Sequence, residues 1–210
     1  VGDANNTITR NVVRNSQNGI VVYDTGHDNN FIANNVIYNN TYRGIWVYRS
    51  ASNNTVVNNT LYNNGKEVHL GHGGQNYDAG PGNIFKNNIL FVSNLGTGIG
   101  VDSYGDPGTL PSGTVFDYND IYAPTGTAGY IDNNTYATLA AWRAGSGQDA
   151  HSISADPLFT NAASGDFHLG AGSPAIDAGT TIAEVIDDKD GAPRPQGSAY
   201  DMGAYEHAAT

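Results

Sequence analysis

The most constraining feature of the sequence is a pair of asparagines that returns every 24 residues. Asn5-Asn6 recurs as Asn29-Asn30 and again as Asn53-Asn54. Two further asparagine columns, which start at Asn11 and Asn15, keep the same spacing. Of the 26 asparagines in the chain of 210 residues, 22 lie in residues 1–94. A fixed period of this length indicates repeats that stack on one another, because a single repeat is too short to bury a core alone.

Each repeat contains three short stretches of apolar residues separated by Asn or Gly. In the second repeat these stretches are residues 31–32, 36–38 and 45–48. Alternating apolar residues predict strands, and strands this short need neighbours to be stable. Asn and Gly tolerate the left-handed backbone that tight corners require. One repeat therefore predicts one coil of three strands and three corners, and stacked coils place equivalent strands in parallel about 4.8 Å apart.

The predicted fold class is all-β, a parallel β-helix whose corner asparagines stack into hydrogen-bonded ladders. The pattern Asn-Asn-x-Ile-x-x-Asn-x-Ile with a later Gly-Ile-x-Val resembles the right-handed parallel β-helix repeat of the pectate-lyase-like superfamily, over residues 5–122. The stretch 135–206, which ends in Asp201-Met202-Gly203-Ala204-Tyr205-Glu206, resembles the C-terminal tail of secreted bacterial members. The resemblance implies right-handed coils and a secreted or cell-surface bacterial protein that meets polysaccharide.

The sequence predicts coils over residues 1–134 and a C-terminal capping region over 135–210. The capping region is irregular, apart from one short helix predicted over 135–144 and ended by Gly145. Trp142 and Phe159 are expected to pack this region onto the last coils. The N-terminal edge is predicted to be open, so we expect either further coils before Val1 or self-association of that edge.

The composition disfavours several classes of binding partner and cofactor. The formal net charge of −11 disfavours binding to nucleic acid or to an anionic membrane surface, and no apolar run is long enough to span a membrane. The chain has no cysteine, which removes thiolate zinc sites and disulfides. The acidic stretch Asp187–Gly191 lacks the spacing of an EF-hand loop, and its expected role is a turn in which Asp side chains bond the backbone. No metal site is predicted, and Ca²⁺ stays open as a cofactor.

The strand that follows the Gly-Ile signal is the best place to seek a site. Aligning its copies from Ile20, Ile45, Val68 and Ile99 predicts two outward columns, Val21/Trp46/His69/Gly100 and Tyr23/Tyr48/Gly71/Asp102. Arg43 and Lys66 enter the same face. Aromatic rings with polar neighbours bind sugars, and two insertions, residues 71–82 and 103–113, would wall this strip. The predicted substrate-binding residues are Tyr23, Arg43, Trp46, Tyr48, His72, Tyr77, Asp102 and Tyr104.

The same strip collects basic residues in an acidic chain. A lyase that cleaves uronic-acid chains needs a base at C5 and a group that neutralises the carboxylate, so Lys66, His69 and Arg49 are the predicted catalytic residues, with Tyr48 a further candidate base. Hydrolysis is the second choice, because it needs two paired carboxyls and the alignment separates Glu67 from Asp102. A rival class is non-catalytic: an adhesive or sugar-binding module, or an inert C-terminal fragment of a larger enzyme.

Overall fold

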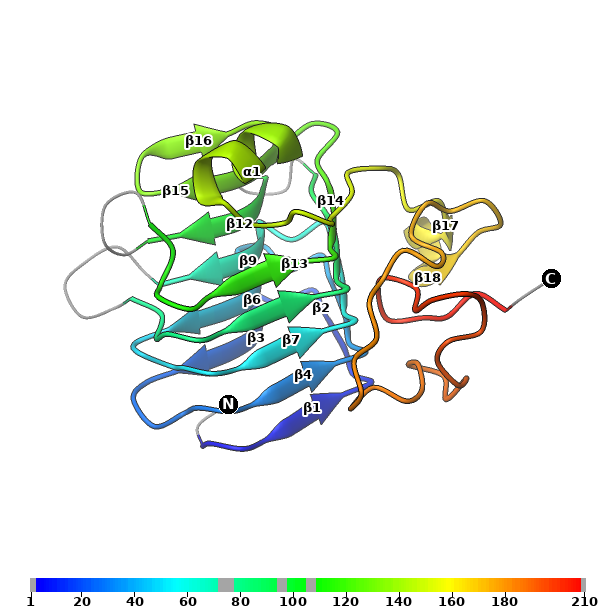
Figure 1. Ribbon diagram of the computed structural model, residues 1–210, viewed down its shortest axis with the longest axis horizontal. Helices are drawn as coiled ribbons and strands as arrows, with labels where there is room; N and C mark the ends of the chain where they lie inside the picture. The colour runs from blue at the N-terminus through cyan, green and yellow to red at the C-terminus, as the bar shows by residue number, and fades with distance from the viewer. Residues whose placement is uncertain (1–2, 72–77, 94–97, 105–108, 209–210) are drawn as a thin grey trace.

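The computed structural model describes residues 3–71, 78–93, 98–104 and 109–208. Their strands wind into a parallel β-solenoid whose coils stack along one axis (Figure 1). Equivalent strands of successive coils pair in parallel: the first two coils are offset by the predicted 24 residues in two of the sheets and by 25 residues in the third. Within these residues no helix is both long enough and apolar enough to cross a membrane.

Three sheets run along the solenoid, and each takes one strand from every coil. Sheet A contains β1 (Thr7–Thr9), β4 (Phe31–Ala33), β7 (Thr55–Val57), β10 (Ile84–Lys86) and β13 (Val115–Asp117). Sheet B contains β2 (Val12–Arg14), β5 (Val36–Tyr38), β8 (Thr60–Tyr62), β11 (Ile89–Phe91) and β14 (Asp120–Tyr122). Sheet C contains β3 (Asn18–Tyr23), β6 (Arg43–Tyr48), β9 (Lys66–Leu70), β12 (Ile99–Ser103), β15 (Thr127–Ile131) and the antiparallel β16 (Asn134–Tyr136).

The corner asparagines work in pairs. The first member of a pair, such as Asn29 or Asn53, has a left-handed backbone, with φ of 58° and 55°. The second member points inward: Oδ1 of Asn54 accepts from both the backbone N–H and Nδ2 of Asn30, at 3.0 and 2.8 Å. Repetition of these bonds builds the predicted ladders, the longest of which is Asn11, Asn35, Asn59, Asn88, Asn119 and Asp149.

Between the sheets lies a column of stacked aliphatic and aromatic side chains. Its fully buried members include Ile32, Ile45, Leu61, Phe85 and Phe116. The rings of Phe85 and Phe116 stack with centroids 4.4 Å apart. Each coil thus buries its apolar residues against the coils above and below it, which a single repeat cannot do alone.

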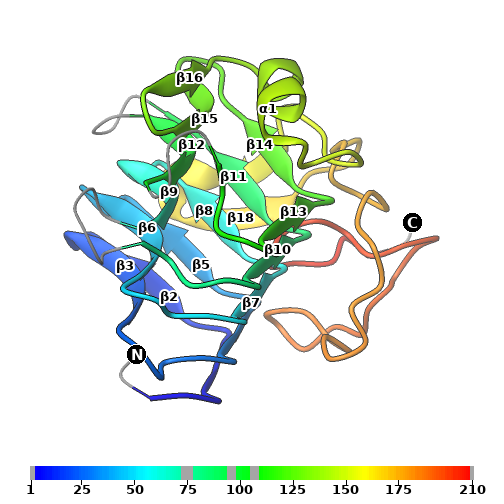
Figure 2. The same ribbon diagram turned by 60° about the vertical axis from the view of Figure 1, so that its left-hand side comes forward.

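Helix α1 (Leu139–Ser146) covers the C-terminal end of the stack, together with β15 and β16 (Figures 1 and 2). The helix begins and ends a few residues later than predicted: Thr138 caps its N-terminus, and Gly147, not Gly145, ends it in a left-handed conformation. Trp142 of this helix is fully buried. Its ring packs edge-on against Phe116, and its Nε1 donates to Asp149. Its predicted role in holding the helix to the last coils is confirmed.

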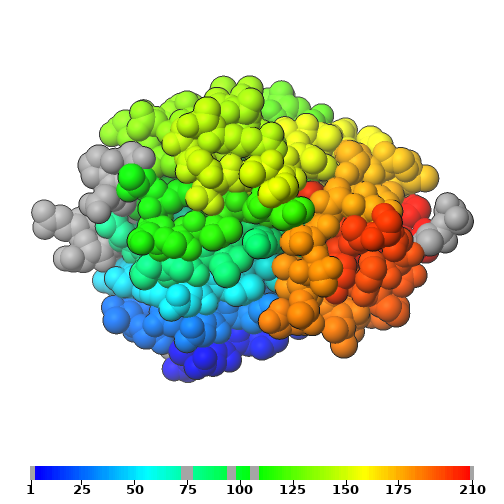
Figure 3. Space-filling view, viewed as in Figure 1, coloured from blue at the N-terminus to red at the C-terminus, as the bar shows by residue number. Residues whose placement is uncertain are grey.

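Beyond α1 the chain turns back along the side of the solenoid. This segment contains β17 (Phe159–Asn161), the 3-10 turn η1 (Ala162–Ser164) and β18 (Asp166–Leu169). Figures 1 and 2 place it beside the coils rather than above the last one, and Figure 3 shows its residues pressed against the stack. Phe159 packs on Phe91 in the fourth coil and on Tyr62 in the third, so its predicted packing on the last coils is confirmed for the fourth coil and also reaches the coil before it.

The corner between sheets A and B anchors this returning segment. The left-handed asparagines of that corner point outward, and Nδ2 of Asn34, Asn58 and Asn87 donates to the carbonyls of Asp187, Asp201 and Thr180 respectively. Arg194 and Glu206 form an ion pair of 2.5 Å with no side-chain exposure. The same asparagine repeat therefore holds the coils together and binds the tail to them.

Candidate functional site

The outer face of sheet C carries the candidate site. Pairing of β9 with β12 aligns Val68 with Val101 and His69 with Asp102. The sequence alignment of this coil was wrong by two residues, because Gly100-Val101, and not Gly98-Ile99, is equivalent to Gly44-Ile45 in β6. The true outward column is Val21, Trp46, His69, Asp102 and Tyr130. The corrected register brings a carboxylate directly beside a histidine.

Asp102 is the centre of this site. One of its oxygens, Oδ2, lies 2.7 Å from Nδ1 of His69 and also forms an ion pair with Nζ of Lys66. Nζ of Lys66 lies 3.4 Å from the same Nδ1. All three residues are buried, with exposed fractions of 0% for Asp102, 1% for His69 and 6% for Lys66. Asp102 thus holds a lysine and a histidine on a single oxygen.

This arrangement fixes the protonation of His69. A carboxylate only accepts, so Nδ1 carries the ring proton and donates it to Asp102, which leaves Nε2 with a lone pair. Nε2 is buried and has no hydrogen-bond partner among the described residues. Burial lowers the pKa of His69 to about 4; the bond to Asp102 opposes this, while the charges of Lys66 and Arg43 add to it. His69 is therefore a neutral imidazole at neutral pH, with Nε2 as its basic atom.

A second cation, Arg43, lies beside the His69–Asp102 pair. The guanidinium of Arg43 is sandwiched between the rings of Tyr42 and Trp46, 3.8 and 3.7 Å from their centroids. It is 2% exposed, its Nη1 bonds Asn18, and burial lowers its pKa. With Lys66 and Arg43 positive, Asp102 negative and His69 neutral, the site carries one excess positive charge. Such a site favours an anion, in a chain whose net charge is −11.

Aromatic rings extend the site toward the N-terminal coils. Trp46 and Tyr48 stack at 3.8 Å with 6° between their planes, and Tyr48 stacks on Tyr23 at 5.8 Å. Nε1 of Trp46 donates to the carbonyl of Gly71. On the other side Tyr104 lies 5.5 Å from the His69 ring, and burial raises the pKa of Tyr104. The strip therefore joins an aromatic platform to a charged, buried centre.

The remaining predicted site residues lie elsewhere. Arg49 follows β6 in a left-handed turn and faces Asp24 at 4.0 Å as an exposed surface pair. Of the catalytic trio, the structure thus brings Lys66 and His69 together and places Arg49 beyond the strand end. His72 and Tyr77 lie outside the described residues.

Glu67 lies next to this site in sequence but faces the interior. Its carboxyl accepts from the backbone N–H and Nδ2 of Asn64, and so ends the ladder of Asn40 and Asn64. It stands in the column of Gly44 and Gly100, where the other coils carry a small residue. Burial raises its pKa to about 8. Glu67 and Asp102 therefore point to opposite sides of sheet C and do not form a carboxyl pair.

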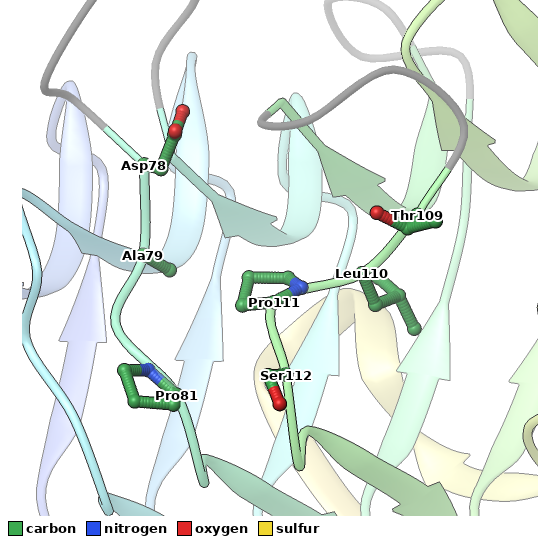
Figure 4. A pocket seen from close by; sticks show the side chains of 7 residues that line it. All are labelled: Asp78, Ala79, Pro81, Thr109, Leu110, Pro111 and Ser112. Atoms are coloured by element: carbon green, nitrogen blue, oxygen red, sulfur yellow. The ribbon is translucent and has the colours of Figure 1, made fainter.

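A hollow of about 390 Å³ lies past the ends of β9 and β12 (Figure 4). It is lined by Asp78, Ala79, Pro81, Thr109, Leu110, Pro111 and Ser112. Two chain segments, 78–81 and 109–112, form its opposite sides in Figure 4. These segments belong to the two insertions that the sequence predicts to wall the strip.

Metal ligands do not gather in the described part of the chain, where no cluster of three or more His, Cys, Asp or Glu side chains is suited to an ion. In the acidic turn, Oδ1 of Asp188 accepts from the backbone of Asp190 and Ala192, and its Oδ2 accepts from Glu206. The predicted turn that bonds its own backbone is thus confirmed.

Sequence reasoning missed three features of the site. The pairing of Asp102 with His69 was hidden by the register error. Tyr42 was not singled out, although its place next to Arg43 is the signal for a ring over the guanidinium. Tyr130 extends the outward column by one coil and lies 5.7 Å from Tyr104. Aligning Gly100-Val101 with Gly44-Ile45 would have found the first of these.

Comparison with protein-family models agrees with the fold. A solved structure of pectate lyase Pel9A is similar, at 15% identity over 96% of this chain and 69% of that one, but its TM-score of 0.30 bears on neither activity nor substrate. No curated protein matches this chain. Residues 1–141, about two thirds of the chain, match the family model described as a right-handed β-helix region. The chain therefore belongs to the right-handed β-helix family.

Proposed function

We propose that this protein acts on an acidic polysaccharide at the outer face of sheet C. The observation that supports this best is the buried His69–Asp102 pair beside two cations: Nε2 of His69 carries the lone pair and has no hydrogen-bond partner within the described residues. Buried titratable groups with shifted pKa values are typical of functional sites. Stacked Trp46 and Tyr48 supply the kind of surface on which sugar rings pack.

The reaction that suits these groups is β-elimination on a uronic-acid chain. Nε2 of His69 takes the proton from C5, the carbon next to the carboxylate. Lys66 and Arg43 stabilise the negative charge that builds up on the carboxylate. The electron pair then forms the C4–C5 double bond as the C4–O bond breaks, and the leaving oxygen takes a proton from water. Hydrolysis suits this face less well, since it needs two carboxyls and Glu67 points to the interior.

The burial of His69, which is 1% exposed, favours a second candidate function, a binding module without turnover. In that case the aromatic platform, with Tyr23 at 39% exposure, binds sugar and the buried pair serves as support. Both candidates fit a protein of the cell surface or the extracellular space that meets polysaccharide.

A screen of uronic-acid and neutral polysaccharides tests the proposal, with and without Ca²⁺. Ultraviolet absorbance reports unsaturated uronate products, and reducing ends report any cleavage. We expect absorbance to rise on uronic-acid chains, and His69→Ala to lower the rate by about 10²–10⁴-fold. His151→Ala, a 60% exposed histidine away from the site, should keep the rate.

Other outcomes distinguish the alternatives. Reducing ends without absorbance would mean hydrolysis and overturn the elimination. Retained sugar binding without any cleavage, with binding lost in Trp46→Ala, would establish the module. Absence of both binding and cleavage would overturn the assignment of the site.

A further inference from the structure

In this site the Lys66 ammonium and the His69 ring N–H share one acceptor atom, a carboxylate oxygen of Asp102. Nζ of Lys66 and Nδ1 of His69 both contact Oδ2 of Asp102, while Oδ1 of the same carboxylate is buried and finds no partner in the part of the chain that the structure describes. A ligand that drew either Lys66 or His69 away would leave the Asp102 carboxylate bonded to the remaining one. The site is therefore built so that Lys66 and His69 compete for Asp102.

Lys66 is the member that a ligand would meet first. Its side chain is 7% exposed, against 2% for His69 and 0% for Asp102. Its ammonium lies over the rings of Tyr104 and Tyr42, at 5.2 and 5.9 Å, which hold a cation only weakly. A lysine stem is flexible, whereas the His69 ring is fixed between Trp46 and Tyr104.

We infer that Lys66 is a carboxylate-operated switch: a uronate carboxylate draws its ammonium away from Asp102, which is left as the partner of His69 alone. This inference rests on the proposed function and adds to it how the substrate turns on the base. An anionic ligand satisfies the excess positive charge of the site, and the freed carboxylate oxygen strengthens its bond to His69.

The electrostatics of the site agree with this geometry. Charged and titratable groups face His69 from every strand around it: Arg43 from β6, Lys66 from β9, Asp102 from β12 and Tyr104 beyond the end of β12. Burial is the largest cause of the low pKa of His69; the bond to Asp102 raises that pKa, and the charges of Lys66 and Arg43 lower it further. A base with a pKa of about 4 is weak at neutral pH, so withdrawal of Lys66 moves His69 toward the range in which a general base works best.

The experiment is an NMR titration of the His69 ring in the full chain, assigned by comparison with His69→Ala. Sodium galacturonate is the probe, and galactose is its neutral control. We expect galacturonate to raise the pKa of His69 by about one unit, in line with the effect of one nearby charge, and galactose to leave it unchanged.

Lys66→Met isolates the lysine. Without any ligand, this variant should show His69 titrating near the value found in the galacturonate-saturated natural protein, and added galacturonate should change it little. Lys66→Gln, which removes the charge but keeps a polar end on the side chain, serves as the second variant, and Lys86→Met on β10 of sheet A is the matched control.

The switch is overturned if Lys66→Met and Lys66→Gln leave the pKa of His69 unchanged, or if galacturonate fails to raise it in the natural protein. It is also overturned if galacturonate raises that pKa equally with and without Lys66. Failure of the proposed function gives a different result. If the pKa of His69 responds as expected but the protein cleaves no polysaccharide, the switch is supported and the lyase is excluded. Unsaturated products without any His69 response retain the lyase and exclude the switch.

Discussion

At the scale of single residues, the two asparagines of each corner divide the work. The first adopts the left-handed backbone that turns the chain, which Asn does at lower cost than most residues. The second satisfies the buried polar groups that the turn leaves, since its amide both donates and accepts along the axis. This explains why the repeat needs Asn twice and cannot replace the inner member by an apolar residue of similar size.

Asn59→Ala tests the inner ladder. Asn59 accepts from Asn35 and donates to Asn88 and to the Ile32 carbonyl, so its loss leaves several buried groups unpaired. We expect a loss of about 2–4 kcal/mol in the free energy of unfolding by urea. Asn11→Ala, at the exposed end of the same ladder, should cost less than half of that. Equal losses at both positions would contradict a cooperative role for the buried bonds.

Glu67 gives a prediction of pH dependence. Burial raises its pKa from 4.5 to about 8, so between these values the folded protein holds a proton that the unfolded chain has lost. The free energy of unfolding therefore falls as pH rises through this window and levels off above it. Glu67→Gln, which cannot ionise, should be more stable than the natural protein by about 4 kcal/mol at pH 8, with the difference vanishing near pH 4.5. Thermal melts measure this, with exposed Glu184→Gln as control.

At the scale of elements, close approach between neighbours sets which residues fit. Helix α1 lies on the last coil because Trp142 packs where Gly129 has no side chain. A Cβ at Gly129 would lie 2.1 Å from Cε3 of Trp142. The glycine is thus needed for space beneath the helix, and the last strand and the helix that ends the stack form one packing unit.

Gly129→Ala tests that unit. The added methyl should force α1 away from β15 and lower the free energy of unfolding by about 2–3 kcal/mol. Tryptophan fluorescence should report greater exposure of Trp142. Gly26→Ala serves as the control, because a Cβ there meets no atom within 4 Å and only the cost of its φ of 87° remains. An unchanged fluorescence spectrum in Gly129→Ala would contradict the packing role.

At the scale of the whole molecule, the C-terminal segment beyond α1 runs along the side of the stacked coils; we call this segment the strap. It crosses several coils, and its anchors are the outward asparagines and the buried Arg194. Besides its ion pair with Glu206, Arg194 donates to Asn34 and to the carbonyls of Asp201 and Gly203. The strap therefore stabilises coils that are far apart in the sequence.

Arg194→Met tests the strap. Its loss leaves Glu206 buried without its cation, and removal of one partner of a buried pair costs about 3–5 kcal/mol. We expect early cleavage of residues beyond 180 in limited proteolysis. Arg10→Met breaks the exposed pair with Asp187 and should change the stability by less than about 1 kcal/mol. A strap equally resistant in both variants would contradict this account.

The sequence alone determined the coil, its ladders and its core. Those features repeat at a fixed spacing, and each depends on residue types that few other local structures require, as with the left-handed corner asparagines.

Lys66 and His69 could be placed on one face for the same reason. Their partner Asp102 could not, because the coil that carries it follows an insertion and its Gly-Ile-Gly-Val offers two registers that differ by two residues. Both registers keep the same face outward, so alternation cannot choose between them. Only hydrogen bonding between β9 and β12 decides, and that pairing brings one carboxylate oxygen to both side chains. The path of the strap was likewise set by tertiary contacts, since Asn34 and Asn58 lie more than a hundred residues from the carbonyls to which they donate.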